Sequence, residues 1–106
     1  MRLAVLQLVA SAGDVARNLA QLETAAARAA AAGADLLVAP ELALTGYGAA
    51  EAIRARADGD AADALAAIAS RHGLALVVGC TDADDAGRYN AARLVRPDAA
   101  DVVYRK

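Results

Sequence analysis

The sequence predicts an α/β fold in which one mixed sheet carries its helices on one face. Short apolar runs that are typical of buried strands alternate with segments of helical periodicity over residues 3–79. Each helical segment joins two strands, and parallel neighbouring strands require such long connections. Two more strands follow as a meander with short polar turns. The length of 106 residues suits one modest core, so a single domain is expected.

The first strand and the first helix come from the N-terminal third of the chain. Residues 3–9 form an apolar run, which we interpret as a strand rather than a secretory signal because Gln7 interrupts it. Asp14 is a suitable helix N-cap, and the helix should end at Gly33. Between them the apolar residues recur at helical spacing: Val15, Leu19, Leu22, Ala26 and Ala29.

The second and third strands are continuous apolar runs. Residues 36–39 are stopped by Pro40, whose missing N–H cannot join a ladder, and residues 74–79 form the next run. Neither run alternates with polar residues, so both faces of the sheet should be covered. The two crossover helices are expected to cover one face, and the other face needs a further layer.

The second crossover helix is predicted from Asp60, because Asp63 three residues later resembles a capping box. The Ala- and Arg-rich segment before it predicts a short helix or an irregular stretch that closes at Asp58 and Gly59. The buried stripe and the end of the second helix are given by Leu65, Ile68, Ala69, His72 and Gly73.

The meander occupies the remainder of the chain. Residues 89–95 and 102–106 are predicted strands, and residues 82–87 and 96–101 are predicted turns. The first of these turns is acidic but lacks the ligand spacing of an EF-hand. We therefore interpret its carboxylates as part of a solvated turn rather than a metal site: Asp82, Asp84 and Asp85.

Composition excludes several classes of function. The formal net charge is −2, and the arginines are scattered singly, so a nucleic-acid partner is not expected. No apolar stretch approaches the roughly 20 residues of a spanning helix, so no membrane association is expected. Cys80 is the only cysteine, which excludes an internal disulfide framework and fits a reducing compartment, with the cytoplasm as the default location.

Two motifs that suggest chemistry are better explained by structure. "GYGAAE" resembles a dinucleotide loop, but Glu51 replaces the third glycine and places a negative charge where a pyrophosphate would bind. Cys80 with His72 suggests a nucleophile and its base. Cys80, however, continues an apolar run, and His72 suits a helix C-terminus, so we interpret Cys80 as a core residue.

Glu41 and Lys106 are the stronger candidates for a site. Glu41 directly follows Pro40 at the carboxyl end of a strand, where α/β sheets tend to carry their chemistry, although a capping role in the loop explains its position equally well. Lys106 is the only lysine in a chain that otherwise uses arginine. A lysine in place of an arginine indicates a position that needs a compact charge on a flexible stem, although chance would also account for a single lysine.

Six segments together resemble the N-terminal part of the nitrilase superfamily of carbon–nitrogen hydrolases, in the order of that family. They are "LAVLQL", "GDVARNLAQLE", "GADLLVAPELALTGY", "LALVVG", "YNAARLVRPD" and "YRK". The resemblance implies the first half of an α-β-β-α sandwich, so residues 1–106 would be the N-terminal portion of the domain. One departure is "RPDAAD", where the family commonly has a glycine after the aspartate.

The resemblance also implies hydrolysis of a non-peptide carbon–nitrogen bond through a cysteine thioester. Glu41 matches the family's general base, and Lys106 matches the lysine that stabilises the tetrahedral intermediate. Tyr47 would line the pocket, although a packing role is as well supported. The family's nucleophilic cysteine follows the "YRK" lysine, so this chain would be truncated before it and inactive alone. The implied substrate is a small amide, nitrile or carbamoyl compound, with no metal or organic cofactor, in a homo-oligomer.

Two alternatives to a truncated enzyme remain open at this stage. The chain would be a noncatalytic assembly module if it buries its uncovered sheet face against another subunit. It would instead complete an active site by complementation if a separate chain supplies the second half of the domain.

Overall fold

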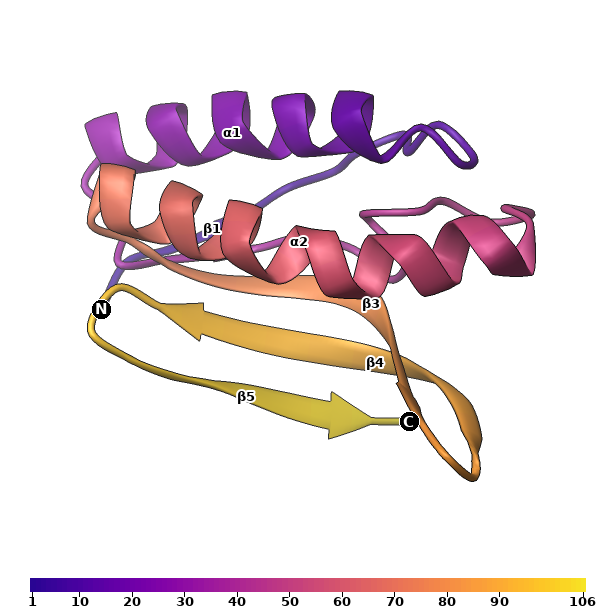
Figure 1. Ribbon diagram of the computed structural model, residues 1–106. Coiled ribbons are helices and arrows are strands. Elements are labelled where there is room, and N and C mark those ends of the chain that lie inside the picture. The colour runs from indigo at the N-terminus through magenta and orange to yellow at the C-terminus, as the bar shows by residue number, and fades with distance from the viewer.

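The computed structural model contains one five-stranded mixed sheet with both helices packed on the same face (Figure 1). It describes residues 1–50 and 61–106 in full, and of residues 51–60 only that they belong to a helix. The elements are β1 (Leu3–Val5), α1 (Val15–Ala31), β2 (Leu36–Val38), α2 (Glu51–His72), β3 (Ala75–Asp84), β4 (Gly87–Arg96) and β5 (Ala99–Arg105). The predicted fold class is confirmed.

The strands lie side by side in chain order. β1, β2 and β3 are parallel and are connected through α1 and α2, whereas β3, β4 and β5 form antiparallel hairpins. The predicted crossovers and meander are therefore both present. The parallel strands end close together at one edge of the sheet, and the candidate site lies there, with Glu41 after β2, Asn90 on β4 and Lys106 after β5.

β1 is shorter than the run of residues 3–9 from which it was predicted. Its last ladder residue, Val5, lies opposite Val38, the last residue of β2. Pro40 stops β2 two residues later, so the chain beyond β1 has no neighbouring strand with which to pair. The apolar residues at positions 6–9 instead form a loop that leads to α1, and Val9 is 89% exposed.

α1 begins and ends where the sequence predicts. The carboxylate of Asp14 accepts a hydrogen bond of 3.0 Å from the backbone N–H of Arg17, which satisfies one of the free donors of the first turn. Leu22 and Ala26 are buried against the sheet and α2 as expected. The buried side of α1 also includes Asn18, a polar residue that the apolar pattern did not indicate.

α2 ends at Gly73 as predicted, in the left-handed conformation that glycine adopts without strain. Its predicted buried residues Leu65, Ile68 and Ala69 all belong to the core. The helix as a whole is longer than the one predicted from Asp60, because it spans Glu51–His72. The predicted closure at Asp58 and Gly59 and the capping box at Asp60 lie outside the fully described residues.

The two hairpins are longer than their apolar runs suggested. β3 continues through Asp84, which lies opposite Gly87 at the start of β4, and β5 already begins at Ala99. Asp82 and Asp84 therefore belong to a strand, and the expectation that they lie in a solvated turn is wrong. Ladder hydrogen bonds come from the backbone, so an antiparallel pair can extend into residues whose side chains face water.

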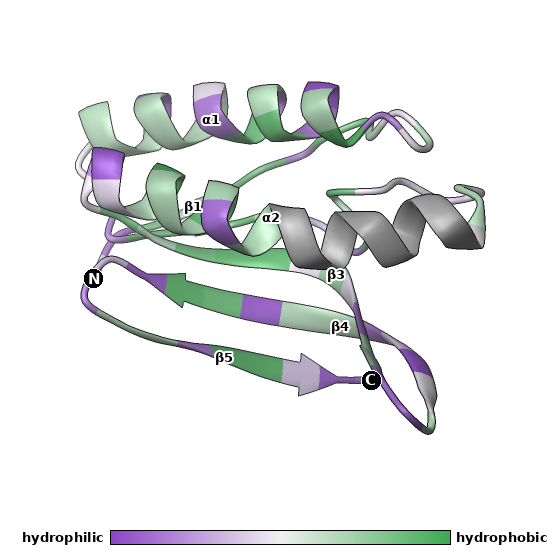
Figure 2. Cartoon of the chain, viewed as in Figure 1, coloured by the Kyte–Doolittle hydropathy of each residue, from purple (hydrophilic) through white to green (hydrophobic). Residues whose placement is uncertain are grey.

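The core lies between the helices and the sheet, and the opposite sheet face is also apolar. One register row on that opposite face runs across all five strands: Val5, Val38, Val77, Leu94 and Val102. Figure 2 shows apolar residues along β3, β4 and β5. Val5 is 71% exposed and Val102 is 52% exposed, so this row has no covering layer among the residues that the structure describes in full. We call it the open face.

Candidate active site

The segment after β2 turns sharply and carries Glu41 onto the edge of the sheet. The N–H of Ala39 still donates to the carbonyl of Val77 at 2.8 Å, and Pro40 then ends the ladder. Leu42 has a positive φ of 50°, which is uncommon for a residue with a side chain. Glu41 thus lies at the carboxyl end of a parallel strand, as the sequence predicts.

Gly79 of β3 lets this segment approach the sheet closely. A Cβ atom at Gly79 would lie 2.3 Å from the carbonyl oxygen of Pro40 and 2.6 Å from the Cα atom of Glu41. Both neighbours are backbone atoms, which cannot rotate away as a side chain would. The absent side chain of Gly79 therefore sets the distance between Glu41 and the sheet.

Asn18 holds the far end of the same segment. Its side chain is buried at 1% exposure and donates to the carbonyl of Leu44 at 2.8 Å. It also donates to the carbonyl of Ser11 at 2.9 Å and accepts from the Ser11 N–H at 2.8 Å. Three backbone groups from two loops are thus satisfied by one side chain, so α1 fixes the loop that carries Glu41.

The carboxylate of Glu41 receives three side-chain hydrogen bonds from three different elements. The hydroxyl of Tyr47 donates to Oε2, and the side-chain amide of Asn90 donates to Oε1 at 2.6 Å. The ammonium of Lys106 donates to the same Oε1 at 3.2 Å from 65 residues further along the chain. The structure therefore brings together Glu41 and Lys106, the two residues that the sequence analysis singled out.

These contacts define the ionisation of the site. They lower the pKa of Glu41 below 4.5, and the largest cause is the Tyr47 hydroxyl, followed by Lys106. The same contact raises the pKa of Tyr47 above 10.0, because loss of its proton would place two negative charges together. At neutral pH the site thus contains a carboxylate, a neutral phenol and an ammonium group.

Tyr47 packs little of its surface within this chain. It is 66% exposed, and its polar end rather than its ring is engaged, through the bond to Glu41. Its predicted contact with substrate stays a prediction. The structure adds a function that the sequence did not suggest, which is to hold the Glu41 carboxylate.

A hollow of about 260 Å³ lies beside the three donors, on the open face. Its polar lining is Glu41, Asn90 and Lys106, and its apolar lining includes Val77, Ala92 and Tyr104. The side chains of Lys106 and Glu41 are 75% and 41% exposed, so the hollow is walled on one side only. Its size and mixed lining suit a small molecule with one polar group.

Cys80 and His72 lie elsewhere. Cys80 is 3% exposed and belongs to the core under the helices, as predicted. His72 ends α2, and its Nε2 atom lies 2.5 Å from a carboxylate oxygen of Glu23 on α1. The Arg71 side chain contacts the same carboxylate, and these two partners lower the pKa of Glu23, with Arg71 as the larger cause. The group joins the end of α2 to the middle of α1 and is not part of the site.

Asn90 is the residue that sequence reasoning missed. It lies on β4, and its side-chain amide donates a hydrogen bond of 2.6 Å to Oε1 of Glu41. The available signal was a polar side chain within an otherwise apolar predicted strand, which alternation alone does not assign to a site.

The described residues contain neither a metal-binding cluster nor a membrane-spanning helix. Over residues 1–50 and 61–106, no three His, Cys, Asp or Glu side chains are grouped closely enough to hold a metal ion. Within the same part of the chain, no helix combines the length and the apolar character that crossing a membrane requires.

Comparison with known proteins gives consistent matches. The sequence matches the carbon-nitrogen hydrolase family over residues 2–106. It is 41% identical over 100 residues to the "Hydrolase in pqqF 5'region" of Pseudomonas protegens, a match that covers 90% of this chain and 34% of that protein. An amidase from Nesterenkonia sp. shares the fold at a TM-score of 0.85 with 34% identity, over 100% of this chain and 42% of the amidase.

Further structures of that Nesterenkonia amidase describe it as a member of the nitrilase superfamily, show one variant with butyramide, and show acrylamide added at the active-site cysteine of another. A glutamine-dependent NAD+ synthetase from Acinetobacter baumannii shares the fold alone, at a TM-score of 0.84 with 24% identity, over 98% of this chain and 20% of the synthetase. The chain thus spans less than half the length of each of these relatives.

Proposed function

Because the chain belongs to the carbon–nitrogen hydrolase family, we propose that its Glu41 and Lys106 act in the hydrolysis of a small amide through a cysteine thioester. The observation that supports this most directly is the 3.2 Å contact between the Glu41 carboxylate and the Lys106 ammonium beside a small hollow. A carboxylate and an ammonium in contact supply a proton acceptor and a positive charge at one point, which acyl transfer requires.

In the proposed reaction Glu41 takes the proton of a cysteine thiol, because the thiolate is the reactive nucleophile. The sulfur attacks the amide carbonyl, and Lys106 stabilises the negative charge that develops on the carbonyl oxygen. The carbon–nitrogen bond breaks, ammonia or an amine leaves with the returned proton, and a thioester remains. Glu41 then removes a proton from water, which attacks the thioester and releases the acid and the thiol.

We propose that the nucleophilic cysteine comes from polypeptide outside residues 1–106. Cys80 is buried on the helix side of the sheet, whereas Glu41 and Lys106 lie at the hollow on the open face. The Nesterenkonia amidase has an active-site cysteine, and this chain covers 42% of that enzyme. A layer that covers the open face would also supply the missing wall of the hollow.

A covering layer would also change the electrostatics of the site. In the exposed site, the donors around Glu41 lower its pKa. Exclusion of water by the layer raises the pKa of a carboxylate, whereas the stronger attraction to Lys106 lowers it. The layer would therefore set the base strength of Glu41 through two opposing effects.

A small aliphatic amide is the proposed substrate class. The hollow of about 260 Å³ is small, and the structures of the Nesterenkonia amidase with butyramide and acrylamide show that a relative binds compounds of this size. We include nitriles and carbamoyl compounds as outcomes of a substrate screen, because the same thiolate chemistry attacks all three.

The test uses the natural protein that contains this chain, expressed with everything its reading frame encodes. Ammonia release from butyramide is expected, and Glu41→Gln should lower kcat by about a hundredfold or more, the usual contribution of a general base. Asp98→Asn makes the same chemical change at an exposed turn and should leave kcat unchanged. Unchanged kcat in Glu41→Gln would refute the proposed role of Glu41.

A matched experiment uses the 106-residue chain alone. It is expected to release no ammonia, because no thiol faces the hollow. Release that disappears in Glu41→Gln would overturn the proposal that the nucleophile lies outside these residues.

The open face favours one other candidate function, a noncatalytic module that buries this face against another subunit. The intact mass of the natural protein distinguishes the two functions. A mass well above 10.7 kDa supports the enzyme, and a stable dimer of chains of this size supports the module.

A further inference from the structure

The contact between Lys106 and Glu41 needs support from elsewhere in the molecule. The Lys106 side chain is 75% exposed, and the bond to Glu41 measures 3.2 Å. Exposed pairs of this kind contribute little, because water screens the charges and a long side chain loses freedom on pairing. The position of Lys106 must therefore come mainly from its backbone.

That backbone lies at the end of the last strand. β5 pairs with β4 only, and its other edge has no neighbouring strand in the sheet. The N–H of Lys106 donates to the carbonyl of Asn90 at 2.8 Å, the last bond that holds the strand end to β4. Strand ends with few partners open readily, so one ladder bond is a weak anchor.

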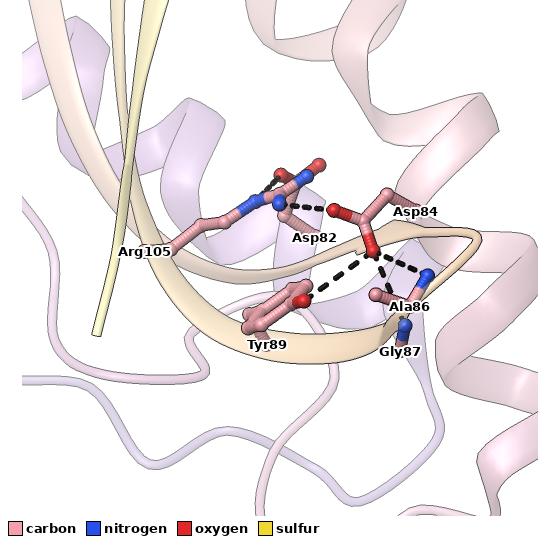
Figure 3. Close-up of polar contacts among 6 residues, drawn as sticks. All are labelled: Asp82, Asp84, Ala86, Gly87, Tyr89 and Arg105. Atoms are coloured by element: carbon pink, nitrogen blue, oxygen red, sulfur yellow. Dashed lines mark hydrogen bonds and ion pairs between the residues drawn. The ribbon is translucent and has the colours of Figure 1, made fainter.

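Arg105 supplies a second anchor from the opposite face of the sheet (Figure 3). Its Nε atom donates to Asp82 at 2.6 Å, and its Nη1 atom donates to Asp84. Its guanidinium carbon lies 4.4 Å from the centroid of the Tyr89 ring. Asp82 and Asp84 belong to β3 and Tyr89 to β4, so one side chain ties β5 to a strand that is not its neighbour.

The anchor is itself fixed in place. Oδ1 of Asp84 accepts bonds from the backbone N–H groups of Ala86 and Gly87 at 2.9 and 3.1 Å, which closes the β3–β4 turn. The Tyr89 hydroxyl also donates to Oδ1, at 3.3 Å (Figure 3). The hydrogen bond from Arg105 is the main cause of a lowered pKa of Asp84, so this carboxylate is charged at neutral pH. Linked charges of this kind hold better than isolated surface pairs.

Strand geometry connects this anchor to Lys106. Successive side chains of a strand point to opposite faces. Arg105 shares a register row with Ala91 and Cys80 on the helix side, so the next side chain projects to the open face, where Glu41 lies. A slip or a twist of β5 at Arg105 would turn Lys106 away from Glu41.

We infer that Arg105 is a positioning residue that holds Lys106 against Glu41 by fixing the end of β5 to the β3–β4 hairpin. The catalytic meaning of this inference rests on the proposed function, whereas the positioning itself is testable without any reaction.

The test measures how strongly Lys106 is coupled to Glu41 in the 106-residue chain. The sequence contains only three glutamates, so a carboxyl ¹³C label gives few resonances, and Glu41→Gln assigns the one from Glu41. Lys106→Met should raise the pKa of Glu41, because a nearby positive charge is removed. In the Arg105→Met background, most of that shift should be lost, since Lys106 no longer lies against Glu41.

The control is Arg96→Met. Arg96 ends β4 at the β4–β5 turn, far along the strand from Arg105, and donates to the Ala100 carbonyl at 2.9 Å. It should leave the Lys106-dependent shift intact. If Arg105→Met does not fold, Asp82→Asn removes one partner of Arg105 from β3 and should reduce the shift in part. A full Lys106-dependent shift in folded Arg105→Met or Asp82→Asn protein would overturn the inference.

A second readout uses the natural protein that contains this chain. Arg105→Met should lower the kcat for ammonia release about tenfold or more with little change in KM. Displacement of a group that stabilises charge in the transition state slows the chemical step more than it weakens substrate binding. If the natural protein hydrolyses no amide while the coupling is lost as expected, the proposed function fails and the positioning inference stands. If amide hydrolysis is present and unaffected by Arg105→Met, the inference fails.

Discussion

At the scale of single residues, Gly79 places Glu41 by what it lacks. Its φ is not in the left-handed region, so backbone conformation does not demand a glycine there. Glycine is required there because of space alone, since a Cβ atom at residue 79 would lie only 2.3 Å from the carbonyl oxygen of Pro40. From the local sequence alone, this glycine would be interpreted only as an interruption of an apolar strand.

Gly79→Ala is expected to push the Pro40–Leu42 backbone off the sheet. The cost of overpacking should be about 1–3 kcal/mol of unfolding free energy, measured by urea denaturation. The Glu41 pKa should also rise toward its ordinary value, because its contacts with Tyr47 and Lys106 depend on the same backbone.

Gly73→Ala provides the comparison for this substitution. It strains the left-handed end of α2, at a φ of 61°, and nothing lies within 4 Å of the added Cβ atom. It should lower stability by about 1 kcal/mol and leave the titration of Glu41 unchanged. An unaltered Glu41 titration in Gly79→Ala would show that Gly79 does not set the position of the carboxylate.

At the scale of elements, Asn18 joins a helix to the two loops on which the site depends. Asn18→Ala should lower the unfolding free energy by about 2–3 kcal/mol, because it leaves the Leu44 carbonyl and the Ser11 N–H without the partner that Asn18 supplies and removes one of two donors to the Ser11 carbonyl. Thr24→Ala on the exposed side of the same helix should change it by less than about 0.5 kcal/mol. Equal losses in urea denaturation would mean that the Asn18 bonds contribute little.

The elements that the sequence predicted well are those whose ends have local signals. Asp14, Pro40 and Gly73 each stop or start an element through their own chemistry, so the start of α1, the end of β2 and the end of α2 match expectation closely. The ends of β3 and β5 carry no such signal. Their extra residues pair through the backbone, which an apolar pattern does not reveal.

The site was predictable in part for a similar reason. The family resemblance, which the match over residues 2–106 confirms, drew attention to Glu41, and the single lysine drew attention to Lys106. Asn90 and the Arg105 anchor were missed because each depends on contacts between strands. Asn90 reaches Glu41 across 49 residues of sequence, and no local spacing encodes that contact.

At the scale of the whole molecule, the open face is the feature with the largest physical effect. Leu3, Val5, Val102 and Tyr104 are each more than half exposed on it, an unusual amount of uncovered apolar surface for a sheet. The 106-residue chain is therefore expected to self-associate, and sedimentation at increasing concentration should show species larger than the monomer.

Charges placed on the open face should reverse this association. The double variant Val5→Lys and Val102→Lys should sediment as a monomer, because burial of an ammonium without a partner is unfavourable. Ala27→Lys adds a charge to the exposed side of α1 and should associate like the unmodified chain. A monomeric unmodified chain would show that the open face alone does not drive association.

The separation of Glu41 and Lys106 by 65 residues has a consequence for folding. The ribosome makes the carboxylate first, then the two strands that separate it from β5, and Lys106 only after all of β5. A nascent chain that stops at Arg105 has the residues of all five strands of this sheet but not yet the ammonium. Closure of this long loop is thus a late event in folding, and the polar pair is complete only when the whole sheet has formed.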